Sequence, residues 1–254
     1  MILNTLNWKA ILNINNHKIS FLDAIRSIGL SIFTKYIPGK VFVILGRAEY
    51  ISFKYPINRK VSTTISLETQ FISIWVGLGM GVLGLILAGG LNKYAFNYLT
   101  IIAWGIISVF IFSPIIKVSI EKLSFRLLKK QINLPHTKIT NVIRSLPYFM
   151  MNWLAWTAGF YFLCNSVIES NVNSLSLGLG FPLAATIGII AIVSPGGLGV
   201  REAVIAYYLS LFELSLVEIT TISVFSRLWF LFGEAFIFFL ALILEIKERN
   251  PKLY

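Results

Sequence analysis

The sequence is poor in the residues that bind metals or form disulfides: it has one aspartate, Asp23, one cysteine, Cys164, and two histidines, His17 and His136. A site built on paired aspartates is therefore excluded, which weighs against Mg²⁺-dependent glycosyl or phosphoryl transfer. A disulfide within the chain and a cysteine-based metal cluster are excluded as well. Both histidines lie in polar connecting segments, where a solvated side chain is more common than a metal ligand. We expect no metal and no cofactor.

Charge is also scarce, because charged residues make up 13% of the 254 residues and hydrophobic residues 56%. With a mean hydropathy of +0.78, the composition indicates an integral membrane protein and not a soluble domain. The formal net charge is +11, yet lysine and arginine are concentrated between apolar runs. This distribution fits cytoplasmic loops beside anionic lipids better than a nucleic-acid-binding surface. We expect anionic membrane lipids as partners and no nucleic acid.

The candidate uninterrupted membrane spans are four long apolar segments: Phe71–Leu91, Asn97–Ile116, Leu146–Ile168 and Glu218–Glu245. The first two have no charged residue and reach the ~20 residues that a spanning helix needs. The segment Lys117–Arg144 is strongly basic, which places it in the cytoplasm, and the tail Ile246–Tyr254 is basic too. The pattern predicts an all-α, multi-pass protein of the cell membrane with both termini in the cytoplasm.

One stretch matches a nucleotide-binding motif in sequence but lacks the structural context that the motif requires. The stretch Gly79–Gly84 fits the dinucleotide-binding pattern, but no strand precedes it and it lies inside an uncharged span. Gly77 and Gly81 are better explained as small residues that allow close helix packing.

The stretch Val193–Glu202 separates two apolar runs and combines a proline with three glycines. Proline does not continue a helix, and glycine adopts backbone conformations that other residues resist. We expect a break between two membrane helices, with Arg201 and Glu202 in the first turn of the second. An ionisable pair within the membrane indicates function by default. The alternative is an interfacial turn whose arginine extends to the membrane surface.

The same arrangement occurs twice in the chain. Pro38-Gly39 is followed 25 residues later by the tetrapeptide Thr-Thr-Ile-Ser at 63–66, and Pro195-Gly196 by the same tetrapeptide at 220–223. Each unit has an apolar arm, a Pro-Gly break, a second arm with charges, a polar turn and a long span. Matched spacing of this kind indicates an internal repeat.

An odd number of spans separates the two breaks, so the second unit is expected to be inverted relative to the first. We expect one transmembrane domain over 1–254, with unit one at 21–91 and unit two at 97–245. Inverted repeats with broken helices are typical of secondary transporters, whose site lies near the midplane, where the breaks meet. Each Pro-Gly-broken helix pair is either re-entrant or a fully crossing hairpin. The helix after Pro195 would direct its amino end at the site, which favours an anion such as a phosphate.

Three segments resemble a known family: Lys35–Lys40, Ser194–Ala203 and Ser226–Trp229. They are similar to the lysylphosphatidylglycerol synthase transmembrane region, a family of flippase-like proteins also classed as an uncharacterised membrane protein family. The resemblance covers nearly the whole chain. It implies a polytopic domain that, in the aminoacyl-lipid synthases, moves the modified anionic lipid between leaflets. Some stand-alone relatives are associated with cell-envelope glycan or polyprenyl-lipid pathways.

The sequence departs from this family in two respects. The soluble aminoacyl-transfer domain of the full synthases is absent, so the resemblance does not imply that this chain aminoacylates lipids. The family also usually has two spans before the segment that here corresponds to Trp8–Leu12. We expect that the chain is truncated at its amino end or that its start was assigned late.

The candidate site residues fall into three groups. The residues expected to bind a lipid head group are Glu68, Arg201, Glu202, Arg227 and Glu234; the hinge residues are Pro38, Gly39, Pro195, Gly196, Gly197 and Gly199; weaker candidates are Lys40, Arg47 and Glu49. We expect the two arginines of the first group to hold an anionic head group. Glu202 and Glu234 would neutralise them when the site is empty. Arg227 and Glu234 share a helix face, and a structural ion pair between helices is the alternative explanation for them.

We therefore expect a non-enzymatic, flippase-like protein that moves an anionic phospholipid or a polyprenyl-linked lipid between leaflets. One alternative is the membrane part of a lipid-linked transferase, in which Glu202 or Glu234 would perform acid–base chemistry. Another is an accessory protein that docks a lipid-modifying enzyme or a glycosyltransferase through the loop Lys117–Arg144.

Overall fold

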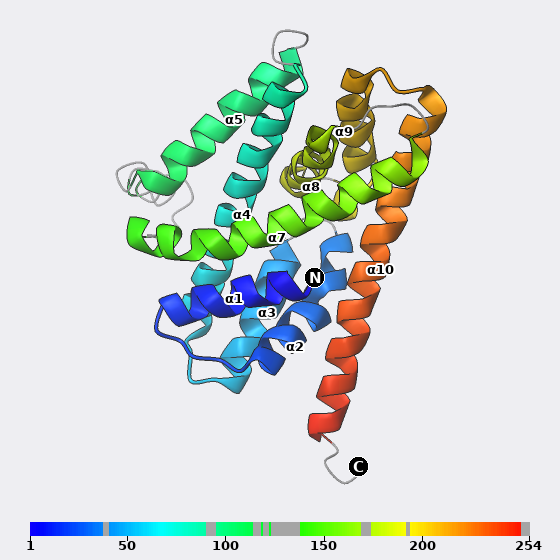
Figure 1. The fold of residues 1–254 in the computed structure, drawn as a ribbon. Coiled ribbons are helices and arrows are strands. Elements are labelled where there is room, and N and C mark those ends of the chain that lie inside the picture. The colour runs from blue at the N-terminus through cyan, green and yellow to red at the C-terminus, as the bar shows by residue number, and fades with distance from the viewer. Residues whose placement is uncertain are drawn as a thin grey trace.

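The computed structural model describes residues 1–37, 41–89, 95–113, 118, 122, 138–168, 174–191 and 194–249. Within these residues all regular structure is helical (Figure 1). In chain order, with η marking a 3₁₀ helix, the elements are α1 (Ile2–Ile14), α2 (Phe21–Ser31), η1 (Ile32–Tyr36), α3 (Val41–Lys54), α4 (Arg59–Leu87), α5 (Ala95–Phe112), α7 (Ile139–Val167), η2 (Leu175–Leu179), α8 (Gly180–Ile190), η3 (Pro195–Gly197), α9 (Val200–Leu209), η4 (Ser210–Phe212) and α10 (Leu216–Arg249).

The first broken helix pair consists of α2 with η1 and α3. Ser20 caps α2, because its hydroxyl accepts a hydrogen bond from the backbone N–H of Asp23 at 3.0 Å. The helix tightens into η1, which ends at Tyr36, and the next helix starts at Val41 and packs back against α2. Two helical arms therefore flank the predicted break. Its Pro38 and Gly39, together with Lys40, lie outside the described residues.

The second broken helix pair consists of η2 with α8 and α9. Gly196, Gly197 and Gly199 have φ angles of +60°, +75° and +77°, in the left-handed region that favours glycine. The Ser194 hydroxyl donates a 2.6 Å hydrogen bond to the carbonyl of Leu198, which closes the turn. The predicted break is confirmed, and Arg201 falls in the first turn of α9, as the sequence indicates.

Each long helix packs against the broken pair that precedes it and also against the first arm of the other pair. Thus α4 contacts both α3 and α8, while α10 contacts both α9 and α2. Figure 1 shows α2 and α3 in the lower half of the molecule, α8 and α9 in the upper half, and α10 running past both. The tips η1 and η3 meet between the halves. The two broken pairs are therefore interlocked through α4 and α10.

Glycines allow the close approach of these long helices. A β-carbon at Gly77 of α4 would lie 2.4 Å from the hydroxyl of Thr186 in α8, and one at Gly81 would lie 2.8 Å from the β-carbon of Leu183. On the other long helix, a β-carbon at Gly29 of α2 would lie 2.4 Å from that of Ala241. The prediction that Gly77 and Gly81 serve helix packing is confirmed.

Charged side chains join the first pair to α10 at the end opposite the tips. The ammonium group of Lys54 contacts a carboxylate oxygen of Asp23 at 2.5 Å and one of Glu248 at 2.6 Å. The guanidinium of Arg26 donates to the same aspartate at 2.8 Å and to the carbonyl of Leu244 at 2.9 Å. The first pair is thus fixed to α10 at both its base and its tip.

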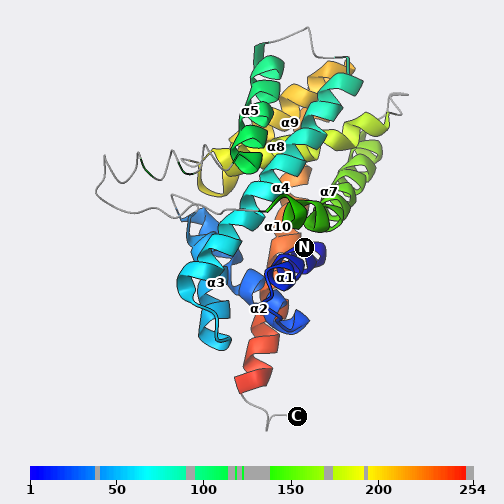
Figure 2. The same cartoon turned by 90° about the vertical axis from the view of Figure 1, so that its left-hand side faces the viewer.

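The remaining helices surround this core. Figure 2 shows α5 on one side of α4 and α7 on the other, and α7 also packs against α1. Among the described residues, α4 and α10 are long and apolar enough to cross a membrane. The other two predicted spans coincide with the shorter α5 and with α7, which contains Pro147. The basic segment Lys117–Arg144 lies mostly outside the described residues.

The outer face of α10 is apolar. Phe232, Phe236, Phe239 and Ile243 are each more than half exposed. Only 17% of an 18-residue apolar stretch of this helix is buried, against 56% of the corresponding stretch of α4. An exposed apolar face of this size is unfavourable in water and is what a helix facing lipid requires.

Candidate functional site

The two tips touch through Tyr36 and Gly196. A β-carbon at Gly196 would lie 2.4 Å from the Cε1 atom of the Tyr36 ring, so the phenol lies directly against the backbone of the other tip. Glycine is needed at position 196 for this close contact as well as for its positive φ.

The helix α10 holds this contact through two polar side chains. The Tyr36 hydroxyl donates a 2.9 Å hydrogen bond to Glu234 and lies 3.4 Å from a guanidinium nitrogen of Arg227 that donates to it. Another nitrogen of Arg227 donates to the carbonyl of Gly196 at 3.2 Å. The predicted pair Arg227 and Glu234 therefore meets at the Tyr36 hydroxyl, and Arg227 also binds the second tip directly.

Glu234 is completely buried and forms an ion pair with Lys35. The ammonium group of this lysine lies 4.7 Å from the ring centre of Phe230. Sequence reasoning did not select Lys35 or Tyr36 as site residues. The feature that could have identified Lys35 is its position, because it is a charged residue at the end of an apolar arm, shortly before the Pro-Gly break.

Arg201 is buried, with 5% of its surface exposed. Its aliphatic stem lies on Gly188, where a β-carbon would be 2.4 Å from Cγ, and its guanidinium carbon lies 4.0 Å from the ring centre of Phe230 and 5.1 Å from that of Phe181. Among the described residues no hydrogen bond or ion pair satisfies this guanidinium, and its Nε is a buried donor without an acceptor. Cation–π contacts with these two rings stabilise it.

Glu202 and Arg227 are the charged neighbours that act on Arg201. One carboxylate oxygen of Glu202 lies 3.8 Å from Nε of Arg227, and the other is buried without a hydrogen-bond donor among the described residues. Both side chains interact electrostatically with Arg201. The described tip region thus contains three cations, Lys35, Arg201 and Arg227, and two carboxylates, Glu202 and Glu234, which leaves an excess of positive charge.

Two of the other predicted residues, Arg47 and Glu49, lie elsewhere, and Glu68 is buried in α4. Arg47 is buried in α3, where it donates to the hydroxyl and the carbonyl of Ser66 and stacks over Trp8 at 4.9 Å. Glu49 is exposed and pairs with Arg59. Arg47 therefore ties α3 to α4 and α1, away from the tips.

The arrangement is suited to binding an anion. Its excess charge is cationic, one guanidinium lacks an anionic partner, and its aromatic walls are apolar. In the described residues no group of three or more histidine, cysteine or acidic side chains could hold a metal ion. A phosphate or carboxylate would satisfy the guanidinium groups by charge-assisted hydrogen bonds.

The fold and this site define an all-helical membrane protein with a buried cationic site between two broken helix pairs. The family model described as "Lysylphosphatidylglycerol synthase TM region" matches residues 1–244, and the chain belongs to that family. No curated protein and no solved structure compared with the chain matches it.

Proposed function

We propose that this protein moves an anionic lipid between the leaflets of the cell membrane and holds its head group at the hairpin tips. The observation that carries this proposal is the buried guanidinium of Arg201, which has no hydrogen bond or ion pair to any residue that the structure describes. Burying a charge without a partner costs several kcal/mol, so a chain that keeps one there needs a compensating use for it. An anionic head group is the partner that would remove this cost.

When the site is empty, the two carboxylates neutralise the other two cations: Glu234 pairs with Lys35, and Glu202 lies beside Arg227. A phosphate that binds Arg201 and Arg227 would compete with Glu202 for the same guanidinium, which is held only at 3.8 Å. Glu234 stays paired with Lys35 and Tyr36 and keeps the tips together. Upon binding, the head group would therefore replace Glu202 at Arg227, while the tips stay joined through Glu234.

The finer topology is also part of the proposal. The two units insert from opposite sides, their tips meet near the midplane, and α4, α5, α7 and α10 cross the membrane. The reciprocal packing of α4 on α8 and of α10 on α2 supports this arrangement, because an inverted repeat produces such equivalent contacts. Both termini then lie in the cytoplasm. On this proposal the chain is a transporter and not an enzyme.

The test is lipid movement in proteoliposomes. Fluorescent phosphatidylglycerol, a polyprenyl-phosphate sugar and zwitterionic phosphatidylcholine are followed by quenching or extraction from the outer leaflet. We expect movement of at least one anionic lipid and a loss of at least tenfold in Arg201→Met. Arg59→Met is the matched control, because Arg59 is an exposed arginine at the start of α4. No anionic lipid moved by folded wild-type protein, or equal rates in Arg201→Met, would contradict the proposal.

A further inference from the structure

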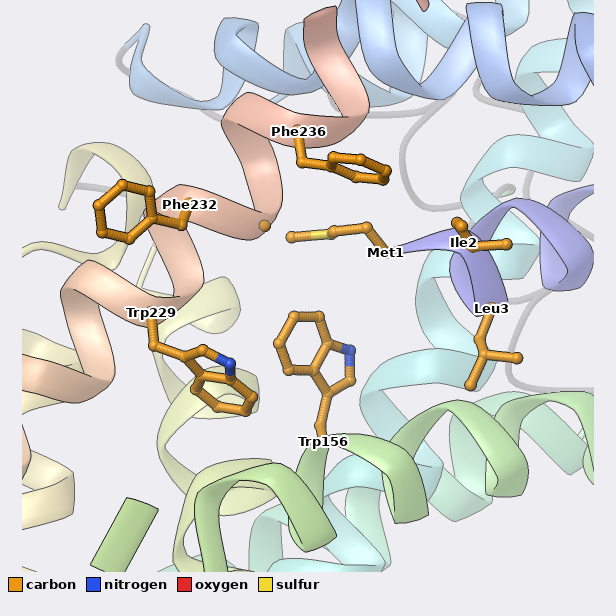
Figure 3. A pocket seen from close by; sticks show the side chains of 8 residues that line it. Met1, Ile2, Leu3, Trp156, Trp229, Phe232 and Phe236 are labelled. Carbon is orange, nitrogen blue, oxygen red and sulfur yellow. The ribbon is translucent and has the colours of Figure 1, made fainter. Parts of the chain in front are cut away.

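Two apolar grooves lie between α7 and α10, on either side of Trp229. One has a volume of about 330 Å³ and is lined by Gly159, Leu163, Phe225, Leu228, Trp229 and Phe232. The other has a volume of about 380 Å³ and is lined by Trp156, Trp229, Phe232, Gly233 and Phe236 together with the first three residues of the chain (Figure 3). Both open on the apolar outer face of α10, where Phe225 is 51% and Phe232 74% exposed.

Two tryptophans close the space between these helices. The ring centres of Trp156 from α7 and Trp229 from α10 lie 5.0 Å apart with their planes at 72°. Figure 3 shows these two rings facing one another beside the groove. Trp229 also lies on Gly159, where a β-carbon would be 2.5 Å from its ring. The contact between α7 and α10 is here made by these tryptophan side chains.

A single further layer of aromatic rings separates these tryptophans from Arg201. Phe181 lies 5.4 Å from Trp156 and 5.2 Å from Trp229, and Phe230 lies 5.1 Å from Trp156. The guanidinium carbon of Arg201 contacts the same two phenylalanines, at 5.1 Å from the ring centre of Phe181 and 4.0 Å from that of Phe230. A continuous series of ring contacts therefore runs from the apolar outer face of α10 to the unpaired cation.

We propose that the gap between α7 and α10 is the lateral doorway of this transporter, with Trp156 and Trp229 as its gate and the two grooves as the binding site for the hydrocarbon chains of an anionic lipid. This inference rests on the proposed function. A lipid head group is covalently tied to its chains, and withdrawing each methylene from hydrocarbon is unfavourable. A head-group site inside the protein must therefore open sideways to the bilayer, and the apolar grooves keep the chains in hydrocarbon while the guanidinium attracts the head group.

The first test fills one groove. A β-carbon at Gly233 would be 3.5 Å from its nearest neighbour, so Gly233→Leu can be accommodated and projects its side chain into the groove. The matched control is Gly105→Leu on α5, where a β-carbon has nothing within 4 Å. In proteoliposomes we expect phosphatidylglycerol movement to fall at least tenfold in Gly233→Leu and to stay within twofold of wild type in Gly105→Leu. Gel filtration and thermal unfolding in detergent verify that both variants are folded.

The second test closes the gap directly, should Gly233→Leu fail to fold. Leu163→Cys on α7 and Phe225→Cys on α10 line the same groove, and Cys164→Ala removes the buried native thiol. Bridging this pair with a bis-maleimide should stop lipid movement, whereas each single cysteine treated identically should retain it. If wild type moves the lipid and movement persists both in Gly233→Leu and in the bridged protein, the doorway proposal is wrong while the proposed function stands. No movement in wild type overturns both.

Discussion

The ring of Tyr36 lies against the backbone of Gly196, so that a β-carbon at position 196 would come within 2.4 Å of it. These residues belong to the tips of two different broken helix pairs. Their contact places the cationic side chains of both pairs and of α10 in one region. The site therefore depends on a contact that leaves no room for a methyl group.

Gly196→Ala should separate the tips. The substitution adds a steric overlap with Tyr36 to the strain of a positive φ of 60°, so we expect a loss of stability of about 2–4 kcal/mol and loss of lipid movement. Gly199→Ala is the control, because residue 199 has a φ of 77° but no neighbour near its β-carbon. It should cost only the backbone strain, on the order of 1–3 kcal/mol. Equal apparent melting temperatures for the two variants would show that Tyr36 does not press on Gly196.

Arg201 and Arg47 should respond oppositely to neutral substitution. Arg201→Met removes an unpaired buried charge, so its apparent melting temperature should equal or exceed that of wild type while transport is lost. Arg47→Met removes hydrogen bonds from a charged group to Ser66 and should cost about 2–3 kcal/mol. Thermal unfolding in one detergent compares the two. A strong destabilisation by Arg201→Met would mean that its charge is a structural element.

Lys35 and Glu234 should be strongly coupled. Glu234→Gln removes the carboxylate that a partly buried ammonium group contacts, and we expect a destabilisation of about 3 kcal/mol. Lys35→Met alone should also destabilise, because it leaves Glu234 without this cation at a fully buried position. The double variant should recover most of the loss, which a double-mutant cycle measures. Additive losses would argue against the ion pair.

Tyr36→Phe tests the role of the hydroxyl of this residue separately from that of its ring. The ring contact with Gly196 stays, but the hydrogen bond to Glu234 is lost, so stability should fall by about 1–2 kcal/mol. Tyr148→Phe on the exposed face of α7 is the control and should change stability by less than about 0.5 kcal/mol. Chemical denaturation of both variants in mixed micelles compares the effects, and identical curves would contradict the role of the hydroxyl.

Local sequence features predicted the breaks but not the partners of the charges. Pro195 and its glycines keep the stretch between α8 and α9 out of a continuous α-helix by backbone chemistry alone, which is why Arg201 could be placed in the first turn of α9. The bond between Tyr36 and Glu234 joins residues 198 positions apart, and no local pattern contains that information. Arg47 shows the converse, since a charge in an apolar arm looks functional until its bonds to Ser66 are seen.

The repeat indicated two equivalent units, yet it could not show the grooves between α7 and α10. These depend on how Trp229 lies on Gly159, which is a matter of side-chain packing between distant helices. Single exposed aromatic residues are ordinary on a helix that faces lipid. Their arrangement around a gap becomes informative only when Phe181 and Phe230 are found to lead from it to Arg201.

The packing of α2 on α10 also has a consequence for synthesis on the ribosome. The hydrogen bond from Arg26 to Leu244 joins residues 218 positions apart, so the first broken pair is translated long before its partner helix exists. Until α10 emerges, the small-residue surface around Gly29 and the charges of Asp23 and Arg26 lack the contacts that this helix provides. Contacts of such high sequence separation form late and slowly. The unit that is made first is therefore the last to be completed.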